Sequence, residues 1–305
     1  MKVAILGARG GWHEARLLEA LDKRGVEPMV LPITRLTGRI GGGSFALSDQ
    51  GRALDECGAV VVRAIPAGSL EQVIFRVDAL HRLARLGVPV INSPRCIERS
   101  VDKYYTSFLL EEAGVPTPRT IACERFEDAM AAVEELGGDV VLKPLFGAEG
   151  RGMVRISDRD VAYRTFRALE LARAVYYLQA YVPHGGRDIR AFVVGDRIVA
   201  AMIRRGESWK TNVAQGAAVE AVDLPRDLAK LALQAARVVD ADYAGVDLLP
   251  HDDGGYFVLE VNGIPGWQGL QRTTTLDVAG VIADHLLARL RGGADGGPPA
   301  IGPER

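Results

Sequence analysis

The sequence predicts an α/β N-terminal domain followed by a larger α+β body. From residue 1 to about 98, short apolar strands alternate with amphipathic helices, a pattern typical of a parallel sheet covered by helices. From residue 100 onward, helices and antiparallel hairpins are mixed instead. A length of 305 residues also exceeds what one hydrophobic core usually supports, so two or three subdomains are expected.

The first 98 residues contain the alternating elements. A helix is predicted at Trp12–Lys23, stopped by Gly25, and a second is capped by Ser69 and runs through Arg85. The glycine-rich segment Gly38–Gly51 between them is predicted to be a mobile substrate loop. The predicted strands are Val3–Leu6, Pro28–Leu31, Ala59–Ile65 and Val88–Asn92.

The body begins with a helix that Ser100 is predicted to cap and that runs through Glu112. Asp158 is predicted to open another helix, and Thr274 with Asp277 resembles a capping box for the last one. Two more helices are expected near residues 124–136 and 227–239. The predicted strands lie in VVLKPLFGAEGRGMVRIS, in VYYLQAYV, and in AFVVG and RIVAAMI, which flank a hairpin turn at Gly195-Asp196.

Composition and charge exclude several classes of protein. The net charge of −2, from 37 basic and 39 acidic residues, gives no general attraction to nucleic acid. The three cysteines are scattered, which favours a reducing compartment over a disulfide framework. The N-terminus is predicted to be a strand and not a signal peptide, and no apolar stretch is long enough to span a membrane. We therefore expect a cytoplasmic protein, with a disordered tail at residues 292–305.

The segment from Ala244 to Pro265 indicates a metal site. It reads as two apolar strands joined by a tight turn, and it carries the acceptor side chains of Asp247, Glu260 and Asn262. Residues 260 and 262 share a face because side chains alternate along a strand. Carboxylate and amide oxygens suit Mg²⁺ or Mn²⁺ better than zinc. The alternative is an exposed hairpin edge with solvated acids.

The register of this hairpin supports the metal hypothesis. Asp253-Gly254 is a strong signal for a two-residue turn, which would place Asp252 opposite Gly255 and Asp247 opposite Glu260. Two carboxylates facing each other repel, so we expect a cation between them.

A glycine-rich loop follows Lys143, which we expect to bind phosphate. The loop, Phe146 to Gly152, includes Gly147, Gly150 and Gly152, and glycines let backbone N–H groups approach a phosphate closely. It is not a Walker A loop, because no Gly-Lys-Ser/Thr follows. An ordinary glycine-rich hairpin is the alternative. Lys103, expected in the first turn of a helix, either reaches the same phosphate or is a solvated lysine.

Other polar residues are less specific. Asp188 and Arg190 share a strand face, where Arg190 could clamp a phosphoryl group or form a salt bridge between strands. Lys210-Thr211-Asn212 by itself reads as a loop. Gly7 to Gly11 lies where a dinucleotide fingerprint would sit, but it lacks the G-x-G-x-x-G spacing, so nicotinamide binding is the weaker interpretation.

Five ordered segments together resemble a known family. They are SVDKYYTSFLLEEAGVPTPRT, VVLKPLFGAEGRGM, the hairpin beginning DIRAFVVG, KTN, and GVDLL…FVLEVNGIPGW. They are similar to segments of ATP-grasp enzymes, most of all the RimK-type α-L-glutamate ligases, over roughly residues 100 to 287. The subgroup that adds glutamate to pterin or deazaflavin coenzymes is the closest, on the segment beginning VVRAIP.

The resemblance implies a domain plan and a set of site residues. The plan is a pre-ATP-grasp α/β domain at 1–98, a central lid subdomain at 99–183 and a C-terminal subdomain at 184–291. By resemblance Arg190 and Arg204 lie near the γ-phosphate, and Asp247, Glu260 and Asn262 hold the metal. The implied ATP-binding residues are Lys103, Lys143, Gly147, Gly150, Gly152, Gln179, Ala180, Tyr181, Val182, Asp188, Lys210, Thr211 and Asn212.

Two of these positions depart from the family pattern. Ala180 stands where the family usually has an acid, so a side-chain contact to adenine is lost while backbone contacts remain. Lys210 stands where many members carry arginine, so a bidentate contact is lost.

The resemblance also implies an activity, in which a carboxylate takes the γ-phosphoryl group of ATP and an amine, that of L-glutamate, attacks the acylphosphate. Mg²⁺ or Mn²⁺, two per site, would offset the repulsion between ATP and the carboxylate. The acceptor is a coenzyme or a protein or peptide C-terminus, with Arg63, Arg76 and the 38–51 loop as candidate contacts, although Arg76 could equally be a helix-surface residue. The family often forms dimers or tetramers. The alternatives are a nicotinamide-dependent oxidoreductase and a non-catalytic nucleotide-binding module.

Overall fold

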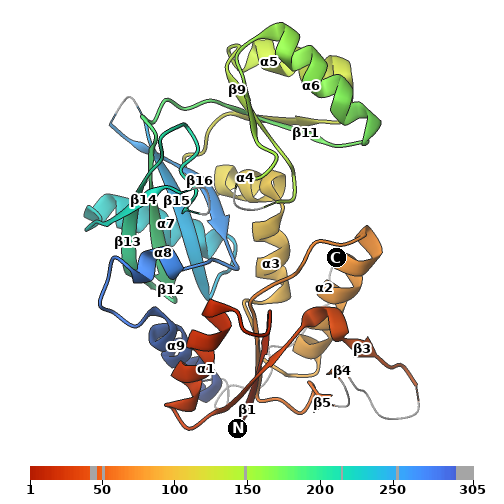
Figure 1. The fold of residues 1–305 in the computed structure, drawn as a ribbon, viewed down its shortest axis with the longest axis vertical. Helices are drawn as coiled ribbons and strands as arrows, with labels where there is room; N and C mark the ends of the chain where they lie inside the picture. The colour runs from red at the N-terminus through yellow and green to blue at the C-terminus, as the bar shows by residue number, and fades with distance from the viewer. Residues whose placement is uncertain (42–46, 50–51, 148–149, 214–215, 252–253, 293–305) are drawn as a thin grey trace. The chain divides into compact units, whose positions relative to one another are not determined.

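The computed structural model divides into two compact units. The first contains residues 1–97, 241–243 and 264–305, and the second residues 98–240 and 244–263 (Figure 1). The structure describes residues 1–41, 47–49, 52–147, 150–213, 216–251 and 254–292. Part of the predicted 38–51 loop, Ala148 and Glu149 of the glycine-rich loop, Asp252-Asp253 of the hairpin and the predicted disordered tail from 293 therefore lie outside the described residues.

The first unit is built on a parallel sheet, as the alternating pattern predicts. Its strand order is β2-β1-β6-β7, with β1 pairing in parallel with β2 and β6, and β6 with β7. The bounds are β1 (Lys2–Leu6), β2 (Glu27–Leu31), β6 (Ala59–Val62) and β7 (Val90–Ile91). The third and fourth strands are shorter than predicted.

Two helices follow β1 and β6 in sequence. Helix α1 (Trp12–Asp22) precedes β2, and α2 (Leu70–Arg85) precedes β7. The predicted cap of α2 is confirmed, because the Ser69 hydroxyl accepts a hydrogen bond from the amide of Gln72, whose side chain accepts from the amide of Ser69. This reciprocal pair satisfies two amide groups that the helix itself leaves unbonded.

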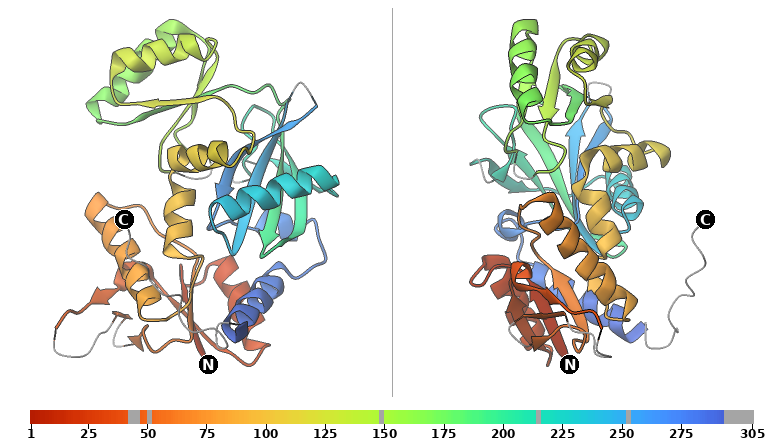
Figure 2. Two further views of the ribbon diagram at one scale, coloured as in Figure 1. Left: turned by 180° about the vertical axis from the view of Figure 1, so that it is seen from behind. Right: turned by 90° about the vertical axis from the view of Figure 1, so that its right-hand side faces the viewer.

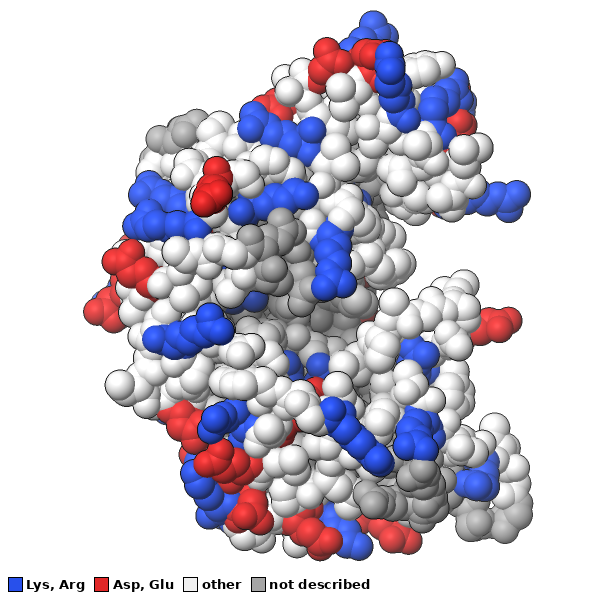
Figure 3. All heavy atoms as spheres, in the orientation of Figure 1, with Lys and Arg blue, Asp and Glu red and all other residues white. Residues whose placement is uncertain are grey.

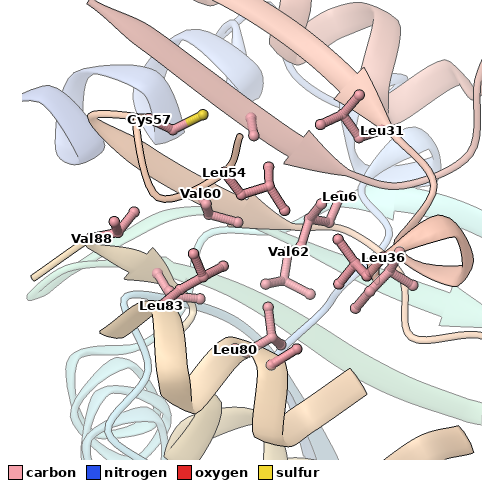
Figure 4. Close-up of a cluster of buried hydrophobic side chains, with 14 of the residues drawn as sticks. Leu6, Leu31, Leu36, Leu54, Cys57, Val60, Val62, Leu80, Leu83 and Val88 are labelled. Atoms are coloured by element: carbon pink, nitrogen blue, oxygen red, sulfur yellow. The ribbon is translucent and has the colours of Figure 1, made fainter. Parts of the chain in front are cut away.

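The buried face of this sheet forms a hydrophobic core. Alternate residues of β1 and β6, Ala4 and Leu6 with Val60 and Val62, contact Leu80 and other apolar side chains of α2 (Figure 4). The chain between β2 and β6 adds the 3₁₀ turn η1 (Ile33–Arg35) and a small antiparallel sheet of β3 (Thr37–Gly38), β4 (Leu47–Asp49) and β5 (Arg52–Ala53). Burial of these side chains provides most of the folding free energy of such a layer.

The second unit begins with two helices where one was predicted. Helix α3 (Pro94–Val101), whose first residues belong to the first unit, contains Ser100, and α4 (Lys103–Glu112) is capped by Asp102, whose carboxylate accepts from the amide of Tyr105 at 3.0 Å. The prediction that Ser100 caps this helix is therefore wrong. Asp102 fits the capping position better because its carboxylate suits the positive end of the helix dipole.

An antiparallel sheet in the order β10-β9-β11-β8 follows. Its strands are β8 (Thr120–Cys123), β9 (Val140–Lys143), β10 (Val154–Ile156) and β11 (Tyr176–Ala180). Helices α5 (Phe126–Glu135) and α6 (Arg159–Leu171) both cover one face of this sheet, where Phe126 and Phe166 join the strand side chains in a shared core (Figures 1 and 2). Asp158 caps α6 as predicted, accepting from the amide of Val161.

The rest of the second unit is an antiparallel sheet in the order β14-β13-β12-β15-β16. Its elements are β12 (Arg187–Val194), β13 (Arg197–Arg205), β14 (Ala218–Ala221), β15 (Tyr243–Pro250) and β16 (Tyr256–Asn262), with α7 (Arg226–Val238) between β14 and β15. The predicted turn at Gly195-Asp196 is confirmed, because Val194 pairs with Arg197.

The β15–β16 hairpin reaches the predicted pairing by a different route. Asp247 faces Glu260, but His251 pairs with Gly255, so three residues and not two separate the strands. The extra turn residue shifts the register by one, and an irregularity between Asp247 and Leu248 shifts it back. The predicted two-residue turn is therefore wrong, although the pairing is right.

The last helices, α8 (Gln268–Gln271) and α9 (Val278–Gly292), belong to the first unit. The predicted capping box for the last helix is wrong, since the helix begins at Val278 and the Thr274 hydroxyl accepts instead from the amide of Leu276. None of the helices in the described part of the chain combines the length and apolar character of a membrane span. On the face shown in Figure 3, basic and acidic side chains are interspersed.

Candidate active site

A cleft of about 920 Å³ lies within the second unit. All but three of the site residues predicted from the sequence line it, and the exceptions are Gly152, Arg190 and Asn262. The predicted residues in the lining are Lys103, Lys143, Gly147, Gly150, Gln179, Ala180, Tyr181, Val182, Asp188, Arg204, Lys210, Thr211, Asn212, Asp247 and Glu260.

Strand alternation explains how the β8–β11 sheet presents side chains to the cleft. Val140, Leu142, Tyr176 and Leu178 pack against α5 and α6. The intervening residues therefore point to the opposite face, and those four are Val141, Lys143, Tyr177 and Gln179, which all line the cleft. The apolar core beneath thus fixes the direction of Lys143 and Gln179.

Lys103 connects α4 to the glycine-rich loop. Its ammonium group donates to the carbonyl of Gly147 at 2.7 Å. Gly150 and Gly152 adopt φ angles of 69° and 73°, which side chains rarely tolerate, and a Cβ at Gly152 would lie 2.9 Å from Cγ of Pro144. The loop therefore requires glycine at these positions for its backbone path.

Lys143 is a buried cation. Its ammonium donates to the Gln179 amide oxygen at 2.5 Å. Burial lowers the pKa of Lys143 to about 8; Lys103 acts in the same direction, whereas Glu260 and Asp247 oppose it. A ligand with negative charge would reverse this penalty, because it favours the charged form of the lysine.

The segment Gln179–Val182, predicted from the resemblance to bind adenine, lies along the wall of the cleft. The amides of Ala180 and Tyr181 donate to the carbonyls of Arg119 and Asp139 at 2.8 and 2.9 Å. Within the described part of the chain, no backbone hydrogen bond involves the Val182 amide at the cleft wall. Arg155, paired with Asp139 at 2.6 and 2.9 Å, lies 3.5 Å over the Tyr181 ring.

A row of alternating charges crosses the larger sheet. The guanidinium of Arg190 donates to both oxygens of Asp247 at 2.6 and 2.7 Å, and Arg204 donates to Asp247 at 2.8 Å. Arg204 also pairs with both oxygens of Asp188. Asp188 pairs with Arg204 across β12 and β13, and Arg190 lies two residues from Asp188, so these three side chains share one sheet face. Asp247 meets them from the neighbouring strand β15.

The pKa values in this row follow from burial and pairing. Burial alone would raise the pKa of Asp247, but Arg190 and Arg204 outweigh it and hold it at about 2. Burial lowers the pKa of Arg204, yet Asp247 and Asp188 together raise it above its ordinary value. Asp247 and Arg204 are therefore both charged over the accessible pH range.

The sequence led us to expect a cation between Asp247 and Glu260. In the structure, the guanidinium groups of Arg190 and Arg204 already provide positive charge beside Asp247. The alternative considered for Arg190, a salt bridge between strands, is the contact that forms. The Glu260 side chain, in contrast, makes no hydrogen bond or ion pair to other described residues and is partly exposed at the cleft wall. The two arginines therefore offset part of the repulsion between the carboxylates of Asp247 and Glu260.

The donor set nevertheless fits a hard divalent cation. Glu260 and Asn262 lie two apart on β16, and Asp247 faces Glu260. Their oxygens match the ligands that Mg²⁺ prefers. In the described ranges, no three histidine, cysteine, aspartate or glutamate side chains gather as metal ligands, so this set depends on the amide of Asn262 as third member.

The segment Lys210–Asn212 is held against the row of charges. The Thr211 hydroxyl donates to Asp188 at 2.7 Å. The turn before it is tightly packed, because the Gly206 amide donates to Gly186 at 2.9 Å and a Cβ at Gly206 would lie 2.2 Å from the Lys210 carbonyl oxygen. The segment is a loop, as it reads in the sequence, and it forms a constrained wall of the cleft.

In the first unit, the Gly7–Gly11 loop considered for dinucleotide binding is packed against Glu14. The Glu14 carboxylate is buried in the Gly7–Gly11 loop and accepts from the Ala8 amide at 3.2 Å. A Cβ on Gly7 or Gly11 would lie 2.3 or 2.0 Å from that carboxylate. The Glu14 carboxylate thus occupies the place that a pyrophosphate would take.

The candidate acceptor contacts in this unit are engaged internally. Arg63 is buried, donates to the carbonyl of Pro265 at 2.9 Å and lies 4.6 Å over the Trp267 ring. Arg76 is buried as well and donates to the Pro66 carbonyl at 2.6 Å, so it is not a helix-surface residue. Neither guanidinium is positioned as an exposed contact.

Sequence reasoning missed several residues of the cleft. Tyr177, His184 and Trp209 line it, and Thr120 contacts Gln179 from β8 at 3.0 Å. Strand alternation from Lys143 and Gln179 could have found Tyr177. Nothing local marks Thr120, whose role depends on the pairing of β8 with β11.

Comparison with known proteins agrees with this architecture. A model of the RimK-like ATP-grasp domain matches residues 100–286, and a model of the RimK pre-ATP-grasp domain matches residues 1–97. A tetrahydromethanopterin:α-L-glutamate ligase of Methanococcus maripaludis is 34% identical over 295 residues, covering 94% of this chain and 98% of the relative. One from Methanocaldococcus jannaschii is 38% identical over 253 residues, covering 81% and 83%.

Solved structures share the fold. A RimK domain protein ATP-grasp from Sphaerobacter thermophilus superposes with a TM-score of 0.73 at 24% identity, over 94% of this chain and all of the other. The ATP-grasp ligase PsnB, in complex with a minimal precursor, Mg and ADP, gives 0.72 at 23% identity, over 95% and 98%. The family models, the curated relatives and the cleft built by the second unit lead to one conclusion, that this chain belongs to the RimK-like ATP-grasp family.

Proposed function

We propose that this protein is an ATP-dependent carboxylate–amine ligase that adds L-glutamate to a carboxylate-bearing acceptor. One observation carries the proposal: Lys103, Lys143 and the glycine-rich loop share a single cleft with Asp247 and Glu260. Cations and backbone amides suit the phosphates of ATP, whereas the carboxylates suit the metal that accompanies them. The names of the relatives, α-L-glutamate ligases, support the same reaction class.

In this proposal the residues of the cleft divide the work of binding ATP. Ala180 to Val182 receive the adenine through backbone groups, and Lys103 and Lys143 neutralise phosphate charge. Gly147, Gly150 and Gly152 shape the loop that covers the phosphates, while Asp188 and Lys210–Asn212 form the opposite wall. Arg204 lines the cleft and Arg190 does not, so any direct contact with the transferring phosphoryl group belongs to Arg204.

Asp247, Glu260 and Asn262 are proposed to hold Mg²⁺ or Mn²⁺, two ions per site. When bound, the metal would offset the negative charge of the phosphates and polarise the γ-phosphoryl group. Arg190 and Arg204 keep Asp247 ionised and fixed in direction, which prepares one ligand in advance. Glu260, which lacks such a partner in the described structure, is the residue that the metal would order.

The proposed reaction has two steps on the substrates. The acceptor carboxylate takes the γ-phosphoryl group of ATP to give an acylphosphate and ADP. The amine of glutamate then attacks the acyl carbon, and phosphate leaves with the formation of the amide. The chain supplies position, cations and exclusion of water, with no covalent nucleophile of its own.

The acceptor class follows the curated relatives. Three of them are named for tetrahydromethanopterin, so a pterin coenzyme is the first candidate, with deazaflavin coenzymes and protein or peptide C-termini after it. The test is release of ADP, screened over amino acids crossed with acceptors, with the masses of the products recorded. ADP release that requires both glutamate and an acceptor would support the proposal. Release with neither, and no ligated product, would contradict it.

Binding measurements separate the competing functions. Calorimetric titration with ATP-Mg²⁺ and with NADH should show heat only for ATP; binding of NADH alone would favour the oxidoreductase. ATP binding without product over all combinations would favour a non-catalytic module. We further propose a cytoplasmic homo-oligomer, dimer or tetramer, without nucleic acid or membrane partners, which light scattering and subcellular fractionation can test.

A further inference from the structure

Behind Lys143 lies a chain of buried polar groups that leads away from the cleft. The Lys143 ammonium donates to the side-chain oxygen of Gln179 at 2.5 Å, and the Gln179 amide nitrogen donates to the Thr120 hydroxyl at 3.0 Å. The Thr120 hydroxyl in turn donates to the carbonyl of Pro118 at 2.8 Å. Thr120 itself does not line the cleft.

The chain fixes which way the Gln179 amide points. Because the Thr120 hydroxyl donates its only proton to the Pro118 carbonyl, it can only accept a hydrogen bond from the Gln179 side chain. The nitrogen of the Gln179 amide must therefore face Thr120, and the oxygen must face Lys143. The Tyr177 hydroxyl, 3.5 Å from the same nitrogen and 2.8 Å from the hydroxyl of Ser107, lies on the same side.

The acceptor given to Lys143 is neutral. An ammonium group has three N–H donors, and in the described part of the chain only one of them finds a protein acceptor. No carboxylate of a described residue forms an ion pair with it, although Glu260 and Asp247 act on it from a distance. The charge of a buried cation is thus left for a ligand to balance.

We propose that Thr120 and Gln179 are positioning residues that hold the Lys143 ammonium toward the phosphates of ATP through a neutral acceptor, so that ATP supplies the counter-charge. This inference rests on the proposed function, because it assumes that ATP occupies the cleft. A carboxylate at position 179 would satisfy the ammonium internally and leave less attraction for the phosphates.

The test compares ATP-Mg²⁺ with adenosine by calorimetry, since only ATP carries the phosphates. Gln179→Glu should weaken ATP binding by at least about tenfold, the worth of one hydrogen bond to a charged group. Thr120→Val, which frees the Gln179 amide to turn, should weaken it about threefold or more. Thr120→Ser keeps the hydroxyl and should restore the wild-type affinity. Adenosine affinity should stay unchanged in both Thr120 variants, because Thr120 does not line the cleft.

Thr117→Val is the matched control. The Thr117 hydroxyl is buried on the same segment and has no hydrogen-bond partner among the described residues, so its removal should leave ATP affinity as in the wild type. Unchanged ATP affinity in Gln179→Glu and Thr120→Val would overturn the inference, and so would a parallel loss of adenosine affinity in Thr120→Val. A wild-type protein that fails to bind ATP-Mg²⁺ at all would instead overturn the proposed function.

Discussion

Asp247 and Glu260 face each other across the β15–β16 hairpin, but only Asp247 is paired with arginine. Asp247 is 3% exposed and accepts from both Arg190 and Arg204, whereas the Glu260 side chain is partly exposed and has no such partner in the described structure. The two carboxylates, although paired across the hairpin, therefore have different surroundings. Asp247, which is also proposed to bind the metal, belongs to the internal charge row, whereas Glu260 has no internal partner among the described residues.

This difference predicts that substitutions at Asp247 and at Glu260 change the free energy of unfolding by unequal amounts. Asp247→Asn leaves two guanidinium groups without their shared carboxylate, so we expect a loss of about 3 kcal/mol in the free energy of unfolding. Glu260→Gln should change it by less than about 0.5 kcal/mol, because no contact is lost. Urea unfolding of the two variants beside the wild type measures both. Equal losses would show that Glu260 is also part of the structural network.

Glu260→Gln should reduce activity strongly, although it should change stability little. Glu260→Gln removes the charge that we assign to the metal, and ADP release should fall by at least about 100-fold, since metal charge stabilisation is worth several kcal/mol. Glu220→Gln is the control, because Glu220 lies on the edge strand β14 with an exposed side chain. Near-normal ADP release by the Glu260 variant would remove Glu260 from the metal site.

The pKa of Lys143, about 8, predicts a pH dependence of ATP binding. Below pH 8 the lysine is charged and attracts phosphate, whereas above it the neutral form gains. The affinity for ATP-Mg²⁺ should therefore fall between pH 7 and pH 9.5, by up to about tenfold for each unit above the pKa. Lys143→Met should bind ATP weakly at every pH, with little change over the range. A wild-type curve as flat as that of the variant would contradict the prediction.

The environment of His13 predicts that acid lowers the stability of the protein. Its Nε2 accepts from the Trp267 amide at 2.9 Å, and burial, followed by Arg63, lowers its pKa to about 4. The folded state thus favours the neutral ring, so this stabilisation is complete above the unfolded value near 6.5 and is lost as pH falls from 6.5 through 4. Urea midpoints at pH 7.5 and 5 should differ more for the wild type than for His13→Gln. An equal difference would exclude this role.

Gly206 predicts a packing effect on the wall of the cleft. A Cβ there would lie 2.2 Å from the Lys210 carbonyl oxygen, so Gly206→Ala must displace the Lys210–Asn212 segment. We expect a loss of about 1–3 kcal/mol in stability together with weaker ATP binding. Gly255→Ala, where the added Cβ meets nothing within 4 Å, is the control and should change neither. An affinity for ATP unchanged by Gly206→Ala would show that this wall does not contact the nucleotide.

Much of the fold could be predicted from local patterns. The alternation of strand and helix predicted the parallel sheet of the first unit, and Ser69 and Asp158 were correctly predicted to cap α2 and α6. The helix beginning at Lys103 was misassigned to a Ser100 cap because serine and aspartate compete for such positions, and the choice depends on where α3 ends. The domain boundaries proposed for the body stay predictions.

The sequence by itself determined the types of side chain and the faces on which they lie, because strand alternation and glycine geometry are local. It placed Glu260 and Asn262 on one face and Lys143 ahead of a glycine-rich loop. Only the tertiary structure decided the partners: Arg190 and Arg204 for Asp247, and Gln179 with Thr120 for Lys143. Those contacts join strands that are distant in sequence, and no local pattern encodes which buried charge will meet which.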